Sequence, residues 1–132
     1  RRGYVREAEI DLFLESVDIK LLINKEVVDD VCIFNLGGVM NHPFGSNYFK
    51  QQFLLSLEQH KKVLLDLEEL TFFDSLSIGT VLNMNNLLKN TGGSLRICSP
   101  NYIVDDFLTT LSIRQIIPIS DTRKQTLQEW ST

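Results

Sequence analysis

The sequence of 132 residues predicts one α/β domain, with a mixed, mostly parallel sheet of four to five strands and about four helices. Short apolar runs of strand length alternate along the chain with segments whose apolar residues recur every three or four positions, which is the spacing of one helix face. Strands that alternate with helices pair in parallel through right-handed crossovers. A hydrophobic content of 43% is enough for a single core in a chain of this length.

The first 17 residues are predicted to lead into a domain that spans residues 18–132. Residues 1–9 are polar and charged, as poorly ordered termini often are. Residues 9–15 alternate between polar and apolar over a few positions, so an extra edge strand and a short helix both stay open. The chain begins without a methionine, which fits a trimmed chain or a piece of a longer protein.

The domain is predicted to open with two strands that pair as a hairpin. Residues 18–24 and residues 31–36 are the two apolar runs, and the polar positions within residues 25–30 indicate a turn between them. Gly37 and Gly38 are expected to end the second strand, because paired glycines are typical of a turn or of a close backbone approach.

The rest of the chain is predicted to alternate between helix and strand. Pro100 suits the first turn of a helix, where its missing N–H costs nothing. The glycines at 92 and 93 are a helix C-terminal signal. The predicted helices start at Ser46 or Asn47 and end near residue 59, cover residues 75–90, begin at Pro100, and cover residues 122–130; the predicted strands are residues 63–67, 94–98 and 116–119.

Composition excludes several classes of function. A net charge of -4 argues against a nucleic-acid-binding protein, which needs a basic face for the phosphates. No apolar run approaches the length of a membrane span, so no direct membrane contact is predicted. Cys32 and Cys98 each lie inside an apolar run and are predicted to be buried and reduced, which fits a reducing cytoplasm.

Signals for catalysis are missing from the sequence. There is neither a phosphate-binding glycine loop followed by Lys and Ser or Thr nor a Gly-x-Gly-x-x-Gly motif after a strand. Neither Ser75 nor Ser77 lies in a Gly-x-Ser-x-Gly motif. His42 and His60 have no partner at ligand spacing. The sequence therefore predicts no metal, no cofactor and no enzymatic activity.

The most informative stretch runs from the buried strand at residues 63–67 into the helix that follows. Asp74 and Ser75 lie between them, and Asp is a favoured N-cap because its carboxylate accepts from the orphan amides of the first turn. Several polar side chains are thus expected at a helix N-terminus, where the partial positive charge favours anions.

Three segments together resemble the STAS family, the domain of bacterial anti-sigma factor antagonists. They are the glycine pair with Asn41 three residues later, the strand at residues 65–67, and residues 73–79, in which Asp-Ser is followed two residues later by Ile-Gly. The likeness extends from about residue 18 to the C-terminal helix. It implies a small sheet with helices packed against one side, and a role in protein binding without catalysis.

The resemblance also implies a partner and a switch. In such proteins the loop and helix start after Asp-Ser dock on an anti-sigma factor with a serine-kinase fold. Phosphorylation of a Ser or Thr there blocks docking and frees the anti-sigma factor to hold its sigma factor. The residues predicted to bind the partner are Asn41, Pro43, Phe44, Asp74, Ser75, Leu76 and Ser77, and the residues predicted to serve structural turns are Gly37, Gly38 and Gly79.

This sequence departs from the family pattern at the switch. Leu76 occupies the position of the usual phosphoacceptor, Ser77 replaces a common glycine, and Asn41 stands where the family often has a loop acid. The favoured interpretation is that the usual switch is lost and the binding-competent state is permanent. The alternative is that Ser75 or Ser77 has become the phosphoacceptor, and for both serines simple helix capping is the competing explanation.

Two other functions stay open at the level of sequence. One is a STAS domain in a different system, such as the cytoplasmic domain of an anion transporter or a lipid-transport accessory subunit. The other is a small enzyme or nucleotide hydrolase that uses Asp74 and Ser75, against which the missing base and phosphate loop weigh.

Overall fold

The structure, a computed structural model, describes residues 4–14, 19–41 and 43–131. The outer parts of the predicted lead-in (residues 1–3 and 15–17) and His42 lie outside the described residues. In chain order the elements are β1 (Tyr4–Leu14), β2 (Ile19–Val28), β3 (Val31–Met40), α1 (Pro43–Ser56), β4 (Lys62–Phe73), α2 (Ser75–Asn90), β5 (Ser94–Cys98), α3 (Tyr102–Thr110), a 3-10 helix (Ile113–Gln115), β6 (Ile119–Ser120) and α4 (Arg123–Trp130).

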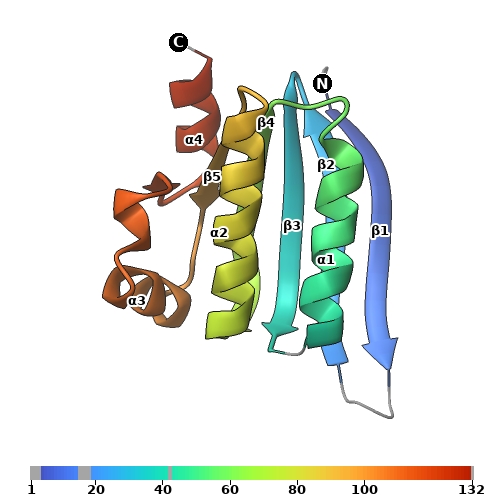
Figure 1. Ribbon diagram of the computed structural model, residues 1–132, viewed down its shortest axis with the longest axis vertical. Coiled ribbons are helices and arrows are strands. Elements are labelled where there is room, and N and C mark those ends of the chain that lie inside the picture. The colour runs from blue at the N-terminus through green and yellow to red at the C-terminus, as the bar shows by residue number, and fades with distance from the viewer. Residues whose placement is uncertain (1–3, 15–18, 42, 132) are drawn as a thin grey trace.

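The strands form one sheet in the order β1-β2-β3-β4-β5-β6 (Figure 1). The first two pairings are antiparallel, and the pairings of β3 with β4, β4 with β5 and β5 with β6 are parallel. The predicted α/β class with a mixed sheet and four helices is confirmed. Residues 4–14 add β1 at one edge, which gives six strands in the described part of the chain; the predicted domain boundary at residue 18 stays a prediction.

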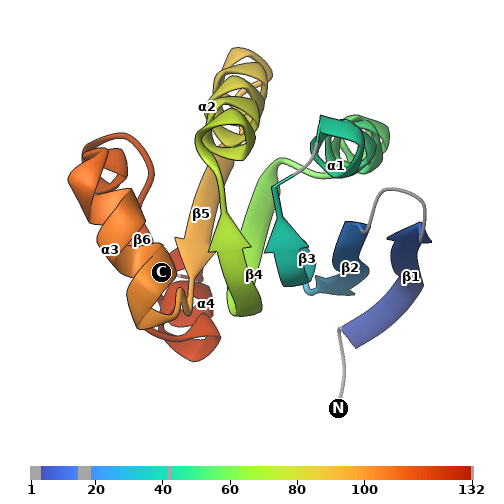
Figure 2. The same ribbon diagram turned by 90° about the horizontal axis from the view of Figure 1, so that it is seen from below.

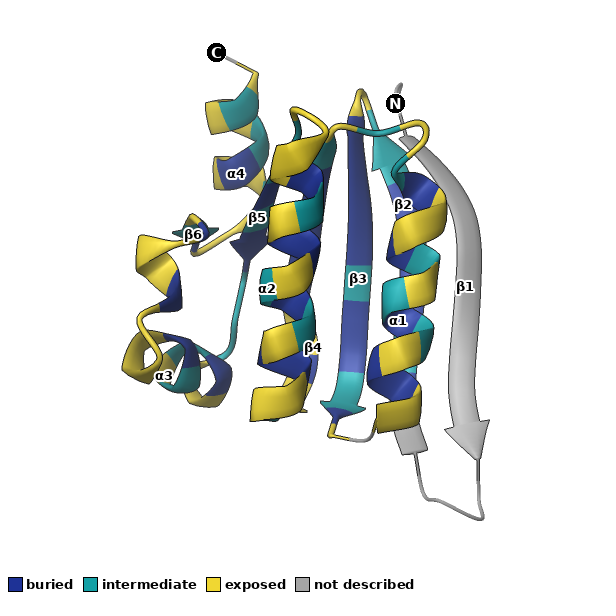
Figure 3. Cartoon of the chain, viewed as in Figure 1, coloured by how far each residue is buried: buried dark blue, intermediate teal, exposed yellow. Residues whose placement is uncertain are grey.

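Helices cover the sheet unequally. α1, α2 and α3 pack on one face, over the main core of apolar side chains from β2, β3, β4 and β5 (Figure 2). α4 lies on the opposite face, where Leu127 and Trp130 pack against a small cluster that includes Ile33, Leu64 and Cys98. The expectation that all helices lie on one side is therefore wrong for α4. Figure 3 shows the resulting pattern, with buried strands behind helices whose outer faces are exposed.

The opening hairpin is longer than the sequence predicts. β2 continues through Lys25 and Glu26, so only Asp29 and Asp30 form the turn, with Asp29 at φ 56°. Glu26 is buried, at 2% exposure. A charged side chain inside a strand resembles a turn residue in sequence, because the partner that permits its burial is distant along the chain.

The glycine pair does not end the second strand as predicted. β3 runs on to Met40, and Gly37 and Gly38 lie within it, at register shifts in the pairing with β4. Gly38 has φ 80°, a conformation that glycine adopts readily. The Thr71 hydroxyl donates to the Gly38 carbonyl at 2.9 Å. These glycines therefore allow irregular strand pairing within the sheet, and they do not form a turn.

Several element boundaries also differ from the prediction. α1 begins at Pro43, a favoured first helical residue, and not at Ser46 or Asn47. α3 begins after Asn101, whose side chain accepts from the Val104 amide, so Pro100 lies just outside it. The last strand is shortened to β6, which follows Pro118. The predicted C-terminal helix is confirmed, with Thr122 as its N-cap.

Both cysteines are free and buried, as predicted. Burial, and next the negative charge of Asp66, raises the pKa of the Cys98 thiol from 9.0 to about 12. A raised pKa in the folded state means that this thiol contributes stability below pH 9 and loses that contribution as the pH rises from 9 towards 12.

We expect Cys98 to resist thiol reagents in the native protein at pH 8, since the thiolate is the reactive form and the side chain is enclosed. Ellman's reagent should report reaction only after denaturation. Across pH 9 to 12, Cys98→Ala should have a shallower fall in stability than the parent. Rapid labelling of Cys98 in the native protein would contradict this account.

Candidate functional site

The start of α2 is fixed by a side-chain cap. The Asp74 carboxylate accepts from the Ser77 amide at 2.9 Å, and Asp74 itself has the extended backbone of an N-cap residue. The Ile78 amide donates to the Asp74 carbonyl at 3.0 Å as the helix begins. The local sequence is sufficient to place this helix start, because the cap lies three residues from the amide that it satisfies.

The end of β3 is bound to the same helix start. The Met40 carbonyl accepts from the Asp74 amide and from the Ser77 hydroxyl, both at 3.1 Å. Ser46 near the start of α1 and Thr80 in the second turn of α2 share a hydrogen bond of 3.0 Å between their hydroxyls. The loop after β3 and the start of α2 therefore lie next to each other, as the predicted binding surface requires.

The predicted site residues differ in exposure. Asn41, Pro43 and Ser75 are exposed. The exposed fractions of the larger apolar side chains are 48% for Phe44 and 53% for Leu76. Asn41, Pro43, Phe44, Ser75 and Leu76 thus form the outer part of this region.

Two predicted residues have other roles in the structure. Ser77 is fully buried, and its hydroxyl is already used by the Met40 carbonyl. Gly79 lies on the exposed side of α2, so its prediction as a turn residue is wrong. A Cβ atom at Gly79 would meet nothing within 4 Å, which means that packing does not require glycine there.

Apolar side chains that the sequence reasoning missed continue this surface towards α3. Phe72 is 45% exposed at the end of β4, and Ile103 is 59% exposed on α3. A hollow of about 260 Å³ lies between them, with Phe107 in its wall. Asn101 holds α3 here, because its side-chain amide donates to the Leu70 carbonyl at 2.8 Å. The predicted strand ended at residue 67, whereas β4 runs to Phe73, so the alternation that leaves Phe72 exposed and Phe73 buried was not applied to these residues.

The chemistry of the region favours contact over catalysis. Its accessible side chains are mostly apolar, and exposed apolar surface grouped at one edge of a fold is typical of a protein interaction site. Among the described residues there is no group of three or more side chains arranged to hold a metal ion. In the same part of the chain no helix is long and apolar enough to cross a membrane.

Comparison with known proteins places the chain in a family. Residues 23–126 match the family model described as the STAS domain. The chain belongs to the STAS domain family. The match covers β3, α1, β4 and α2 completely, and so includes the Asp74 cap and the loop that lies beside it.

The STAS relatives include proteins named for antagonism of anti-sigma factors. A Thermotoga neapolitana protein, named as a candidate anti-sigma factor antagonist, is 29% identical over 105 residues, which are 79% of this chain and 93% of that protein. The anti-sigma F factor antagonist of Paenibacillus polymyxa is 28% identical over 113 residues, which are 84% of this chain and 96% of the relative.

Solved STAS structures have the same fold. The crystal structure of a candidate anti-sigma factor antagonist from Thermotoga maritima superposes with a TM-score of 0.76 at 27% identity, over 81% of this chain and 92% of that one. The phosphorylated form of the Bacillus cell-fate determinant SpoIIAA superposes with a TM-score of 0.65 at 15% identity, over 81% of this chain and 97% of that one. At 15% identity, the comparison with SpoIIAA shows a shared fold and nothing more.

Proposed function

We propose that this STAS domain is a non-enzymatic regulatory protein that acts as an anti-sigma factor antagonist in the bacterial cytoplasm. Its partner would be an anti-sigma factor with a serine-kinase fold, and no nucleic acid, membrane or cofactor would take part. The names of its relatives support the class of function. The observation that carries the docking site is Leu76, which is 53% exposed in the first turn of α2 at the position of the family's usual phosphoacceptor.

An exposed leucine at this position acts as a contact residue. Docking would bury the 53% of its side chain that is exposed, which contributes about half of the roughly 1.5–3 kcal/mol for complete burial of a leucine. Phe44 and Ile103, at 48% and 59% exposure, would extend the contact on two sides. Asn41 adds no negative charge to the surface. The domain would therefore be ready to bind without prior dephosphorylation at residue 76, and control would lie in the partner.

Ser75 is the residue at which a displaced phosphorylation switch would be found. It is exposed, whereas Ser77 is buried with its hydroxyl bonded to the Met40 carbonyl. We expect phosphopeptide mapping of the protein from its own cells to find residues 71–89 unmodified under growth and under stress. Phosphate on Ser75 would mean that the switch survives one residue away. Phosphate on Ser77 would require the helix start to open.

The proposed function is tested by titration calorimetry with purified anti-sigma factors of the serine-kinase type from the same organism. We expect one of them to bind the unmodified domain with a dissociation constant below about 10 μM. Binding should be equally strong before and after phosphatase treatment. If none of these proteins binds, the proposal is refuted. Binding only after phosphatase treatment would refute the interpretation that the domain is permanently competent to bind.

A further inference from the structure

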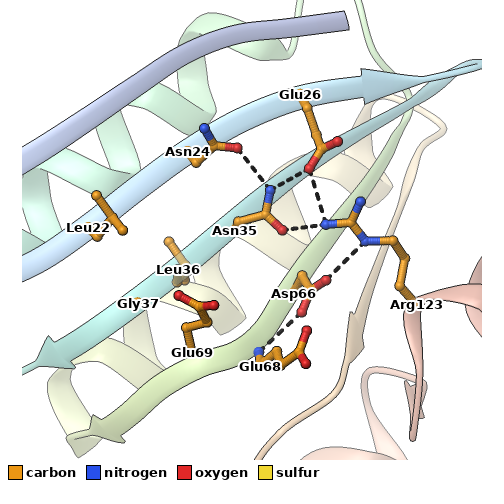
Figure 4. A pocket seen from close by; sticks show the side chains of 10 residues that line it. All are labelled: Leu22, Asn24, Glu26, Asn35, Leu36, Gly37, Asp66, Glu68, Glu69 and Arg123. Carbon is orange, nitrogen blue, oxygen red and sulfur yellow. Dashed lines mark hydrogen bonds and ion pairs between the residues drawn. The ribbon is translucent and has the colours of Figure 1, made fainter. Parts of the chain in front are cut away.

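A second concave site lies on the sheet face opposite α1 and α2. It is a cavity of about 370 Å³ that opens between β2, β3 and β4, beside the start of α4 (Figure 4). The volume is in the range of small-molecule sites. Because α2 packs on the other face of the sheet, this cavity is separate from the proposed docking surface.

One wall of the cavity is a network centred on Arg123. Its Nε donates to the Asp66 carboxylate at 3.0 Å, and one terminal nitrogen donates to Glu26 at 3.1 Å and to the side-chain oxygen of Asn35. Glu26 and Asp66 are almost wholly buried. These contacts hold α4 to β2, β3 and β4 and give the wall a fixed shape.

A bulge in β4 forms the mouth of the cavity. Asn35 pairs with Asp66 but Gly37 pairs with Glu69, so β4 has one residue more than β3 over this interval. The Asp66 carboxylate accepts from the Glu68 amide at 3.1 Å within the bulge. Glu68 and Glu69 are both exposed, and among the described residues neither carboxylate has a hydrogen-bond or ion-pair partner.

Gly37 leaves space in the floor of the cavity. A Cβ atom at this position would lie 3.5 Å from the Cβ of Glu69 and 3.6 Å from the Cβ of Leu22, which are ordinary van der Waals distances. A side chain is therefore compatible with the backbone here, and would fill space that the glycine leaves open.

Asn24 supplies a buried donor at the wall. Asn24 is 6% exposed, and its side-chain oxygen accepts from the Asn35 amide group at 3.0 Å. Its own Nδ2 points away from Asn35, towards the β1 side of the cavity in Figure 4, and has no hydrogen-bond partner among the described residues. A buried donor without a partner costs about 1–3 kcal/mol, which a ligand that supplies an oxygen acceptor would recover.

We propose that this cavity binds a small organic cation, a guanidine or a primary amine, that also carries a carbonyl oxygen. Glu68 and Glu69 would pair with the cationic group, and the Asn24 Nδ2 would donate to the carbonyl oxygen. Among the described residues, four acidic side chains and one basic side chain line the cavity, and the basic one, Arg123, is already engaged by two carboxylates. This balance disfavours anionic ligands such as phosphates.

The test is a titration of ¹⁵N-labelled protein with Nα-acetyl-L-argininamide, followed by the backbone amide signals. Nα-acetyl-L-citrullinamide is the control, because it has nearly the same shape but carries an uncharged urea group in place of the guanidinium. We expect the arginine compound to shift the signals of Asn24, Gly37 and Glu69, with saturation at a dissociation constant below about 1 mM. The citrulline compound should bind at least about tenfold more weakly.

Two variants locate the binding. Glu68→Gln with Glu69→Gln changes only exposed side chains and should weaken binding of the arginine compound at least about tenfold, whereas Glu58→Gln, elsewhere on the surface, should not. Gly37→Val should fill the floor and abolish the shifts. Equal binding of the two compounds, no shift with the cation, or unchanged binding in the Glu68 and Glu69 variant would each overturn the proposal.

Discussion

Leu76→Asp is expected to weaken docking strongly while leaving the fold intact. Leu76 is the second residue of α2 and is 53% exposed, so its substitution removes only a limited area of buried apolar surface. An aspartate in the first turn also interacts favourably with the helix dipole, by about 0.3–1 kcal/mol. The free energy of unfolding should therefore change by less than about 1 kcal/mol in urea denaturation.

Docking should respond far more strongly. A charged carboxylate in place of a central apolar contact costs at least about 2 kcal/mol, which is roughly a 30-fold rise in the dissociation constant. Asn86→Asp is the matched control, because it adds the same charge to an exposed position further along α2. If both variants bind the anti-sigma factor as the parent does, the start of α2 is not the docking site.

Arg123→Met is expected to lower the free energy of unfolding by about 2–3 kcal/mol. The substitution leaves Asp66 and Glu26 buried without the guanidinium that both contact. Breaking a buried ion pair costs about 3–5 kcal/mol of stability. Arg123 is 31% exposed, so water screens this pair in part and the expected loss lies below that range. Loss of the contact also frees the start of α4 from the sheet.

Arg114→Met supplies the comparison for the same change of side chain. Arg114 pairs with Asp105 at 2.5 Å, but both side chains are well exposed, so the loss should be below about 1 kcal/mol. Urea denaturation of both variants gives the two values. A similar loss in the two variants would mean that the buried network contributes no more than a surface pair.

Local signals allowed much of the fold to be predicted. The cap of α2 at Asp74 and the cap of α4 at Thr122 lie three residues from the amides that they satisfy, so sequence alone places both helix starts. The order of strands and helices was also predictable, because the spacing of apolar residues is likewise a local signal. The glycine pair misled because a register shift within a sheet and a turn both favour glycine, and only the pairing of β3 with β4 distinguishes them.

Contacts between distant residues could not be predicted in this way. Glu26 resembles a turn residue in the sequence, because its partner Arg123 lies 97 positions later. The same contact places α4 on the opposite face of the sheet, which apolar spacing does not specify. Asp66, the one charge in an apolar strand, was the only sequence signal for this network. Burial of Ser77 likewise depends on Met40, 37 positions earlier.

The most direct test of the docking account is photo-crosslinking in the cells from which the protein comes. A benzophenone amino acid at position 76 reports what lies against the start of α2, and the same group at the exposed Gln128 of α4 is the control. We predict that an anti-sigma factor with a serine-kinase fold is crosslinked from position 76 and not from position 128. Crosslinking from position 76 to a membrane transporter or a lipid-transport subunit, or the same products from both positions, would contradict the account.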